Sequence, residues 1–471
     1  MSLKAAVIGC LAICAVLLLC AYHLRDYPST EYDEGVYLTT FKSVQAGFPL
    51  YQQTYFSQLP GIFLTTFPIY ALLGSTLAAA RLAVFIYSLL GLLAIFWLGW
   101  EFNSPSFGFV AIGFLYLIPI YTAQILTFHG DSLPPTFSTL ALAAIIHFRR
   151  SRQRRWIVLS ACCAAIAVAI KADLSSLPPI LLLFLIIGVI ERHSLRRFIQ
   201  IAVIFGAAFG IAALLSTLPF GLGAIINNVI DLRLDAASYA PFDPNVFLGF
   251  LKDQPQLIVL LALGLVLSSS VAIQRKTARL PLALLLTWVA STFVLLFSYR
   301  PLMEHHLVLL AVPIVLLFAF ALVQGIDLLD GAVVLRAAVP IFVLAVLISR
   351  VSYVLDEPRG ITTSIEKTGI SLVRADSAAG DYIITDDGLV SAFSQRLTPP
   401  DLTDLSAVRI STGDITDKQF ETILTEYKPK LVLAWDYRLM FLPDFAQIMQ
   451  QFHYLPLLNG DPGHQAYVLN G

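Results

Sequence analysis

The chain has 471 residues, of which 58% are hydrophobic and only 13% are charged, and its formal net charge is −1. Soluble globular proteins carry about 25% charged residues, so this composition excludes an ordinary soluble protein. The near-zero net charge also excludes the basic surface of a nucleic-acid-binding protein.

The charged residues are distributed unevenly along the chain. The last 116 residues carry 25 of them, whereas the first 355 residues carry only 36. Such a low density over so long a stretch is typical of helices embedded in a bilayer. We therefore predict a mainly α, polytopic membrane domain over residues 1–355 and a small extracytoplasmic α/β domain over residues 356–471.

Apolar runs long enough to cross a bilayer recur along the first domain and predict about eleven transmembrane helices. They begin near Ala5, Thr76, Phe107, Ser132, Trp156, Leu174, Phe198, Gln256, Leu280, His306 and Ala337. The first run follows Lys4 without a small-residue cleavage site, so we expect a retained helix instead of a signal peptide. Residues 60–73 are apolar but short and contain prolines, which favours an interfacial or re-entrant helix.

Lys and Arg predict the orientation of these helices. Alternate short loops hold 13 basic residues, including five between Arg149 and Arg155, while the longer opposite loops hold six. By the positive-inside rule the N-terminus is cytoplasmic and the C-terminal domain is extracytoplasmic. We expect a multi-pass protein of the plasma (inner) membrane.

The C-terminal domain has the pattern of a small α/β unit. Residues 382–384 and 431–433 are short apolar runs typical of buried strands. Thr416 and Gln419 have the spacing of a helix N-terminal capping box. Residues 454–458 and 466–469 are predicted to form a terminal strand pair, with turn formers between them.

The same threading places most polar residues of the membrane domain at its outer ends, away from the hydrocarbon. They are Asp33, Glu34, His129, Asp131, Lys171, Asp173, Arg300, Glu304, His305 and His306. Any one of them could be a solvated helix end or a contact to lipid phosphate. Because carboxylates, imidazoles and cations share one depth, we expect them to meet in one outward pocket. Asp33 and Glu34 are adjacent on a predicted helix and therefore have different roles.

Several short motifs resemble the GT-C membrane glycosyltransferases, in particular relatives of protein O-mannosyltransferases, aminoarabinose transferases and lipid A galacturonosyltransferases. The matching residues are Asp33-Glu34-Gly35-Val36-Tyr37, Gly47-Phe48-Pro49-Leu50-Tyr51, Leu59-Pro60-Gly61, Asp131, Lys171, and His305-His306-Leu307 with Pro313. Aminoarabinose transferases have Lys-Pro where this chain has Leu59-Pro60, so their lipid-phosphate contact is not expected there.

The resemblance implies a donor sugar on a polyprenyl phosphate and a lipid, glycan or protein acceptor at the outer face. Asp33 is the expected base, with Glu34 and Asp131 as further catalytic carboxylates. The remaining site residues are expected to bind substrate or stabilise the leaving phosphate. They are Tyr37, His129, Lys171, Arg300, Glu304, His305 and His306.

No cofactor is predicted, although Asp33, Asp131 and His129 offer ligands that a divalent cation accepts. Three alternatives remain from the sequence: a polytopic transporter, a noncatalytic GT-C-like scaffold, and a glycan ligase or polymerase with a polyprenyl-linked donor. A transporter commonly places ionisable residues or broken helices near the bilayer midplane. This sequence places its polar groups at the outer surface, which counts against a transporter. A ligase or polymerase would also use cations at the outer face, but the early acidic motif favours a monosaccharide transferase. The resemblance implies that this transfer is inverting and metal-independent.

Overall fold

The computed structural model describes residues 24, 27–29, 32–171, 195–239, 242–328, 341, 345, 360–459 and 464–470. The predicted spans that begin near Ala5, Leu174 and Ala337, and the candidate residue Asp173, lie outside these residues. The described chain divides into two compact units. The helical unit contains residues 60–171, 195–216 and 242–328, and the α/β unit contains residues 27–59, 217–239, 360–459 and 464–470.

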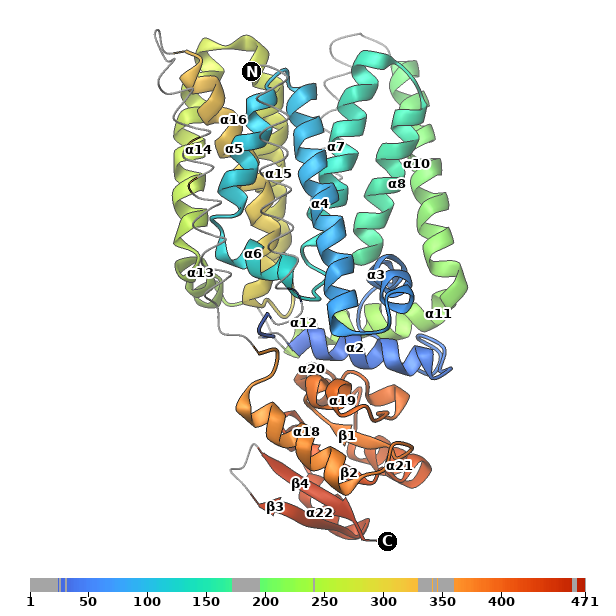
Figure 1. Ribbon diagram of the computed structural model, residues 1–471. Coiled ribbons are helices and arrows are strands. Elements are labelled where there is room, and N and C mark those ends of the chain that lie inside the picture. The colour runs from blue at the N-terminus through green and yellow to red at the C-terminus, as the bar shows by residue number, and fades with distance from the viewer. Residues whose placement is uncertain are drawn as a thin grey trace. The chain divides into compact units, whose positions relative to one another are not determined.

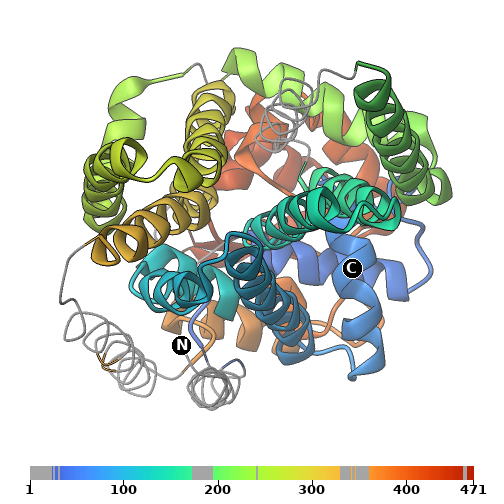
Figure 2. The same cartoon turned by 90° about the horizontal axis from the view of Figure 1, so that it is seen from above.

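The helical unit is built from long apolar helices with short connections. Its elements are α3 (Pro60–Leu72), α4 (Leu77–Glu101), α5 (Pro105–Leu115), α6 (Pro119–Leu126), α7 (Leu133–Ser151), α8 (Arg155–Ile170), α10 (Leu195–Thr217), α13 (Pro244–Asp253), α14 (Pro255–Gln274), η3 (Lys276–Ala278), α15 (Arg279–Ser298), η4 (Glu304–Leu307) and α16 (Val308–Ile326). The long helices run side by side (Figure 1), and Figure 2 looks down them.

Among the described residues, five helices are long and apolar enough to cross a membrane, or six if one bent pair counts as a span. Eight of the predicted span starts coincide with helices to within a few residues; for example, Thr76 is the N-cap of α4. α14 begins at Pro255, and proline suits a first helical position because it lacks an N–H group. α16 is the most buried of these five helices and packs against α5, α14 and α15.

The span predicted to begin near Phe107 is not one continuous helix. α5 and α6 meet at an angle of 84°, with a break between Leu115 and Pro119. The residue before a proline avoids the helical region, and Ile118 is extended at φ −87° and ψ 110°. The apolar run predicted from near Phe107 therefore forms a helix pair that is broken before Pro119.

The segment predicted as an interfacial or re-entrant helix forms α3, a helix of 13 residues. It packs on α4 and α8. A Cβ atom at Gly61 would lie 2.3 Å from the carbonyl carbon of Ala169, so glycine permits the close approach of α3 to the end of α8.

The α/β unit combines the C-terminal residues with two segments from earlier in the chain. Its elements are α2 (Tyr32–Gln45), η1 (Leu218–Phe220), α11 (Leu222–Ile225), the π-helical η2 (Ile226–Asp231), α12 (Leu232–Tyr239), α18 (Ser364–Asp376), β1 (Ile383–Thr385), α19 (Gly388–Ser394), η5 (Pro400–Leu402), α20 (Ala407–Ser411), α21 (Asp417–Tyr427), β2 (Leu431–Ala434), η6 (Arg438–Phe441), α22 (Phe445–Gln451), β3 (Tyr454–Asn459) and β4 (Gln465–Leu469). The unit thus includes residues that the sequence-based boundary at 355/356 assigns to the membrane domain.

The four strands form one mixed sheet in the order β1-β2-β4-β3. β1 and β2 are parallel, whereas β4 is antiparallel to both β2 and β3. Side chains alternate between the two faces of the sheet. Ile383 packs with residues of α18 and α19, while Ile384 packs with residues of α21 and α22. The sheet is therefore the middle layer between helices.

The predicted local features of this unit are confirmed. β1 and β2 occupy the two predicted apolar runs, and β3 and β4 form the predicted terminal pair. The capping box is also present: the Thr416 hydroxyl accepts from the Gln419 N–H at 3.3 Å, and the Gln419 side chain accepts from the Thr416 N–H at 2.8 Å.

Candidate active site

Three chain segments of the helical unit bring a buried polar cluster together. The turn after α6 carries His129 and Asp131, because α6 ends at Leu126 and α7 begins at Leu133. Lys171 follows the last residue of α8, where the backbone becomes extended. The loop after α15 leads into η4, which carries His305 and His306. We call these five residues the Asp131 cluster.

Asp131 is the centre of this cluster and has no solvent exposure. Its Oδ1 atom accepts a hydrogen bond from the Lys171 ammonium, which is itself buried. Its Oδ2 atom lies 3.4 Å from His129 Nδ1 and 3.5 Å from His305 Nε2. The Lys171 ammonium supplies the opposite charge that a buried carboxylate requires, and His129 Nδ1 accepts a hydrogen bond from the Asp131 N–H at 3.4 Å.

The imidazole rings of the cluster continue into a row of aromatic rings. Ring centroids lie 4.7 Å apart for His129 and His305, 4.3 Å for His305 and His306, and 4.1 Å for His306 and Tyr299. His129 is fully buried, whereas the side chain of His305 keeps 15% of its surface exposed. His305 is therefore the imidazole of this row most open to an incoming group.

Three atoms of the Asp131 cluster could act as ligands of a metal ion. They are one oxygen of Asp131 and one nitrogen each of His305 and His306, all within 4.8 Å of one another. Two contacts make this a poor cation site. The Lys171 ammonium already neutralises Asp131 and would repel a second cation. His306 Nδ1 accepts a hydrogen bond from the Met303 N–H at 3.0 Å, which leaves the ring proton of a neutral imidazole on Nε2.

Two predicted site residues of the same unit make other contacts. The Arg300 guanidinium lies 4.8 Å from the ring centroid of Phe242 and donates to the Tyr299 carbonyl at 2.6 Å. Glu304 accepts from the Gln254 side chain at 3.1 Å. Both residues precede the His305–His306 pair in sequence: Arg300 lies in the loop before η4, and Glu304 is the first residue of η4.

The acidic motif lies in the α/β unit, in the first turn of α2. Asp33 is half-buried, and its Oδ2 atom accepts a hydrogen bond from the Tyr37 hydroxyl at 3.1 Å, one helical turn further on. Glu34 has no solvent exposure. The two adjacent carboxylates therefore lie in different surroundings, because successive residues point about 100° apart around a helix.

Tyr32 fixes the start of α2 to the C-terminal part of the unit. The Arg438 guanidinium lies 3.7 Å from the centroid of its ring, and its hydroxyl donates to Asp404 at 3.4 Å. Burial, followed by the charge of Asp404, raises the pKa of Tyr32 well above 10. Tyr32 is therefore a neutral hydrogen-bond donor at physiological pH.

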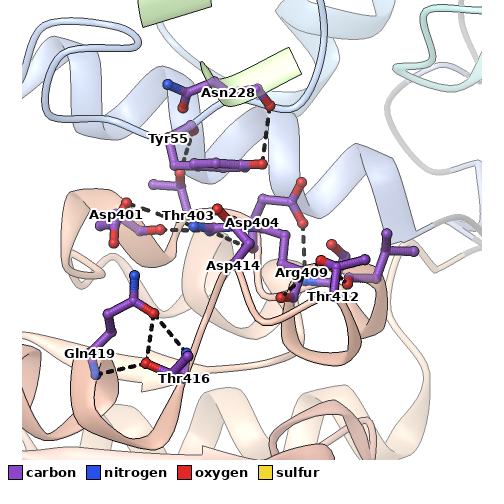
Figure 3. A network of polar contacts seen from close by, with 12 residues as sticks. Tyr55, Asn228, Asp401, Thr403, Asp404, Arg409, Thr412, Asp414, Thr416 and Gln419 are labelled. Atoms are coloured by element: carbon purple, nitrogen blue, oxygen red, sulfur yellow. Dashed lines mark hydrogen bonds and ion pairs between the residues drawn. The ribbon is translucent and has the colours of Figure 1, made fainter. Parts of the chain in front are cut away.

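Figure 3 shows a second attachment, centred on Arg409. The guanidinium lies 3.2 Å from the Tyr55 ring centroid and forms ion pairs with Asp414 and Asp401 at 2.5 and 3.7 Å. The Thr403 hydroxyl donates to the Tyr55 carbonyl at 2.8 Å. The Tyr55 hydroxyl donates in turn to the Asn228 carbonyl at 3.1 Å, so all three segments of the α/β unit meet here.

Sequence reasoning missed several residues around these sites. Tyr299 joins the histidine row, and its position beside Arg300 in a candidate loop was the available signal. Tyr32 precedes the acidic motif directly, but its partners Asp404 and Arg438 are more than 370 residues away in sequence. Such pairings follow from the tertiary fold and leave no local pattern.

Residues 60–218 match the protein family described as dolichyl-phosphate-mannose-protein mannosyltransferase. ArnT from Cupriavidus metallidurans in the apo state has a similar structure, with a TM-score of 0.63, 12% identity and coverage of 98% of both chains. The same protein bound to undecaprenyl phosphate gives a TM-score of 0.61 at 11% identity, covering 99% of this chain and 98% of that one.

The Archaeoglobus fulgidus oligosaccharyltransferase in complex with Zn and sulfate is also similar, with a TM-score of 0.59 and 13% identity over 97% of this chain and 73% of that chain. The comparison with curated protein sequences found no similar protein. These findings confirm the resemblance to GT-C enzymes: the chain has the GT-C fold of membrane glycosyltransferases.

Proposed function

We propose that this protein is a membrane glycosyltransferase that moves a sugar from a polyprenyl-phosphate donor to an acceptor at the outer face of the plasma membrane. The observation that carries the proposal is the Asp131 cluster: a buried ammonium paired with a buried carboxylate, beside a row of imidazoles. The fold match to an ArnT structure that holds undecaprenyl phosphate supports the donor class. The acceptor is a lipid, glycan or protein with a nucleophilic hydroxyl or amine.

The proposed reaction is a single displacement at the anomeric carbon. The acceptor oxygen or nitrogen forms the new bond to this carbon while the bond from the carbon to the phosphate oxygen breaks. The electron pair of the broken bond leaves with the polyprenyl phosphate, and the acceptor proton passes to the Asp33 carboxylate. One displacement inverts the configuration of the sugar. The transition state is oxocarbenium-like.

Asp33 suits the role of base because it is only half-buried. Its hydrogen-bond partner Tyr37 is also a predicted substrate contact. The Tyr37 hydroxyl donates to one oxygen of this carboxylate and so orients it on the first turns of α2. Glu34, with no exposure, is proposed to support the same reaction from a protected position, as a group that orients the acceptor or the helix.

The leaving phosphate gains negative charge as its bond to the sugar breaks, and preorganised donors stabilise such charge. We propose Lys171 and Arg300 as its cations and His305 and His306 as hydrogen-bond donors. Asp131 and His129 hold Lys171 and His305 in place, since both groups contact the Asp131 carboxylate. Glu304 shares the loop with the histidines and is proposed to contact substrate.

The transfer is proposed not to require a metal, because the ammonium of Lys171 already neutralises Asp131, one of the carboxylates that could bind a divalent cation. Activity is therefore expected to persist in excess EDTA. A fall to background in EDTA that added divalent cation reverses would contradict this part of the proposal.

The test is transfer by the purified full chain from labelled polyprenyl-phosphate sugars to a panel of lipid, glycan and peptide acceptors. Asp33→Asn keeps the shape of the side chain but removes the base, so we expect it to fold and insert normally and to lose transfer by at least about 100-fold. Asp231→Asn, in η2 of the same unit, is the matched control. Normal turnover by Asp33→Asn would remove Asp33 from the mechanism.

A further inference from the structure

The two sides of α2 differ in what they carry. With about 100° between successive residues, Asp33 and Tyr37 share one face of this helix. Tyr32, Gly35, Thr39 and Lys42 share the opposite face. Because both faces belong to one helix, any movement of the face with Tyr32, Gly35, Thr39 and Lys42 also moves the proposed base, Asp33.

The opposite face of α2 packs directly on α19, backbone against backbone. A Cβ atom at Gly35 would lie 2.6 Å from the carbonyl carbon of Gly388, and one at Gly388 would lie 2.5 Å from that of Gly35. Such distances are far below van der Waals contact. Only a pair of glycines permits so short a distance between the two backbones. The contact therefore determines how closely α2 approaches α19.

Polar contacts extend the same face in both directions. The Thr39 hydroxyl donates to the Gly388 carbonyl at 3.2 Å, and the Lys42 ammonium donates to the Ala392 carbonyl. At the other end, Tyr32 meets Arg438 and Asp404. Four consecutive positions of the face, spread over three turns, are thus held by residues of the C-terminal part.

These partners lie at one edge of the sheet. α19 begins three residues after β1, and Arg438 lies four residues after β2, so both follow the carboxyl ends of the two parallel strands. Open α/β sheets bind their ligands at this edge. Here the edge contacts a helix of the same chain, and that helix carries the acidic motif.

We propose that the C-terminal α/β domain is a positioning platform for the catalytic helix, with Gly388 and Arg438 as positioning residues for the Asp33 carboxylate. This inference deepens the proposed function and rests on it, because it assumes that Asp33 takes the acceptor proton. Removal of a proton in the transition state tolerates little displacement of the base, and a shift of about 1 Å can cost about 100-fold in rate.

Gly388→Ala is the test variant, and Gly380→Ala is its matched control, because a Cβ atom at Gly380 meets nothing within 4 Å. We expect kcat to fall at least about 10-fold in Gly388→Ala while the KM for the donor changes less than about 3-fold. Gly380→Ala should match the wild type in both constants. Because a partly unfolded preparation would also lower the apparent kcat at unchanged KM, kcat is calculated per folded molecule, counted in the monodisperse fraction from size-exclusion chromatography.

Hydrogen exchange of the full chain gives a readout that does not depend on activity. In Gly388→Ala the amides of residues 36–43 should exchange at least about 10-fold faster, while those of β1 and β2 keep their wild-type protection. If Gly388→Ala unfolds the whole unit, Thr39→Val takes its place, since it removes the bond to the Gly388 carbonyl with little change of shape. The same exchange and kinetic criteria then apply.

The outcomes separate this inference from the proposed function. A wild-type chain that transfers no sugar from any polyprenyl-phosphate donor contradicts the proposed function. An active wild type whose α2 exchange and kcat are unchanged by Gly388→Ala contradicts only the platform. Faster exchange in α2 together with unchanged kcat also overturns the platform, because the position of α2 would then not matter for the chemistry.

Discussion

At the scale of single residues, the buried ion pair of Asp131 and Lys171 is the centre of the candidate site in the helical unit. Its carboxylate has no exposure, so it depends on the charge of the Lys171 ammonium, and the imidazoles of His129 and His305 lie close to its second oxygen. Removing one partner of a buried ion pair typically costs about 3–5 kcal/mol, because the other charge stays buried without compensation. Stability and chemistry therefore rest on the same pair.

Lys171→Met is expected to lower the free energy of unfolding by about 3–5 kcal/mol. Adding Asp131→Asn removes the uncompensated charge and should recover part of this loss, although both variants lose transfer. The measurement is a denaturant titration of the purified chain in detergent micelles, arranged as a double-mutant cycle. Losses that simply add would show that the two side chains do not stabilise each other.

Asp387 gives a second prediction at this scale. It caps α19 by accepting from the Leu389 and Val390 N–H groups at 2.9 and 3.2 Å. Burial, followed by the charges of Glu366 and Asp436, raises its pKa from 3.8 to about 7. The folded state therefore binds more protons than the unfolded state between these values, so stability falls as the pH rises from about 4 to 7.

Asp387→Asn keeps a good N-cap and removes this titration. The variant should be more stable than the wild type at pH 8, and the decrease in stability between pH 4 and 7 should become smaller. One pKa unit corresponds to about 1.4 kcal/mol, so the gain is at most about 4 kcal/mol and is reduced by solvent around this partly exposed side chain. Pulse proteolysis in urea at pH 4, 7 and 8 measures the free energy of unfolding of both proteins. If the pH dependence of the variant equals that of the wild type, the stability change does not come from Asp387.

At the scale of helices and strands, close backbone contacts decide the packing. Gly61→Ala places a methyl group 2.3 Å from the Ala169 carbonyl carbon, so α3 must move away from α8. We expect a loss of about 1–3 kcal/mol in the free energy of unfolding. Gly206→Ala in α10 is the control, because its Cβ atom meets nothing within 4 Å and alanine favours a helix. Equal stability of both variants would contradict a tight α3–α8 contact.

Elements were predictable from the sequence where local chemistry defines them. The capping box at Thr416, the four strands and eight span starts follow from hydrogen-bonding side chains and apolar periodicity. The break between α5 and α6 was missed although Pro119 signals it, because the hydropathy of the run continues across the proline. The contact of Gly35 with Gly388 could not be predicted, since it joins residues more than 350 positions apart.

At the scale of the whole molecule, the sequence identified the fold through the order of its motifs, and the similar structures confirm it. Among the candidate residues, the helical unit brings together His129, Asp131, Lys171, His305 and His306. The sequence predicted that Asp131 and Lys171 lie in one outer pocket, but it did not predict that they pair. The topology indicates how deep a residue lies in the membrane, and it does not indicate which helices lie beside one another.

Sidedness remains a prediction that labelling can test. Single cysteines in a cysteine-free background, at the exposed position 253 before α14 and at position 413 in the C-terminal part, should react with an impermeant maleimide added outside intact cells. A cysteine at position 153, within the basic loop of residues 149–155, should react only after permeabilisation. The reverse pattern would invert the proposed topology.

Donor cleavage at the outer face is the central claim. Its most direct test supplies a labelled polyprenyl-phosphate sugar and an acceptor to sealed, right-side-out vesicles that contain either the wild type or Asp33→Asn at equal levels. We predict that wild-type vesicles release polyprenyl phosphate and form an inverted glycoside at matching rates, and that Asp33→Asn vesicles do neither. Equal product from both, or product only when the vesicles are opened, would contradict the account.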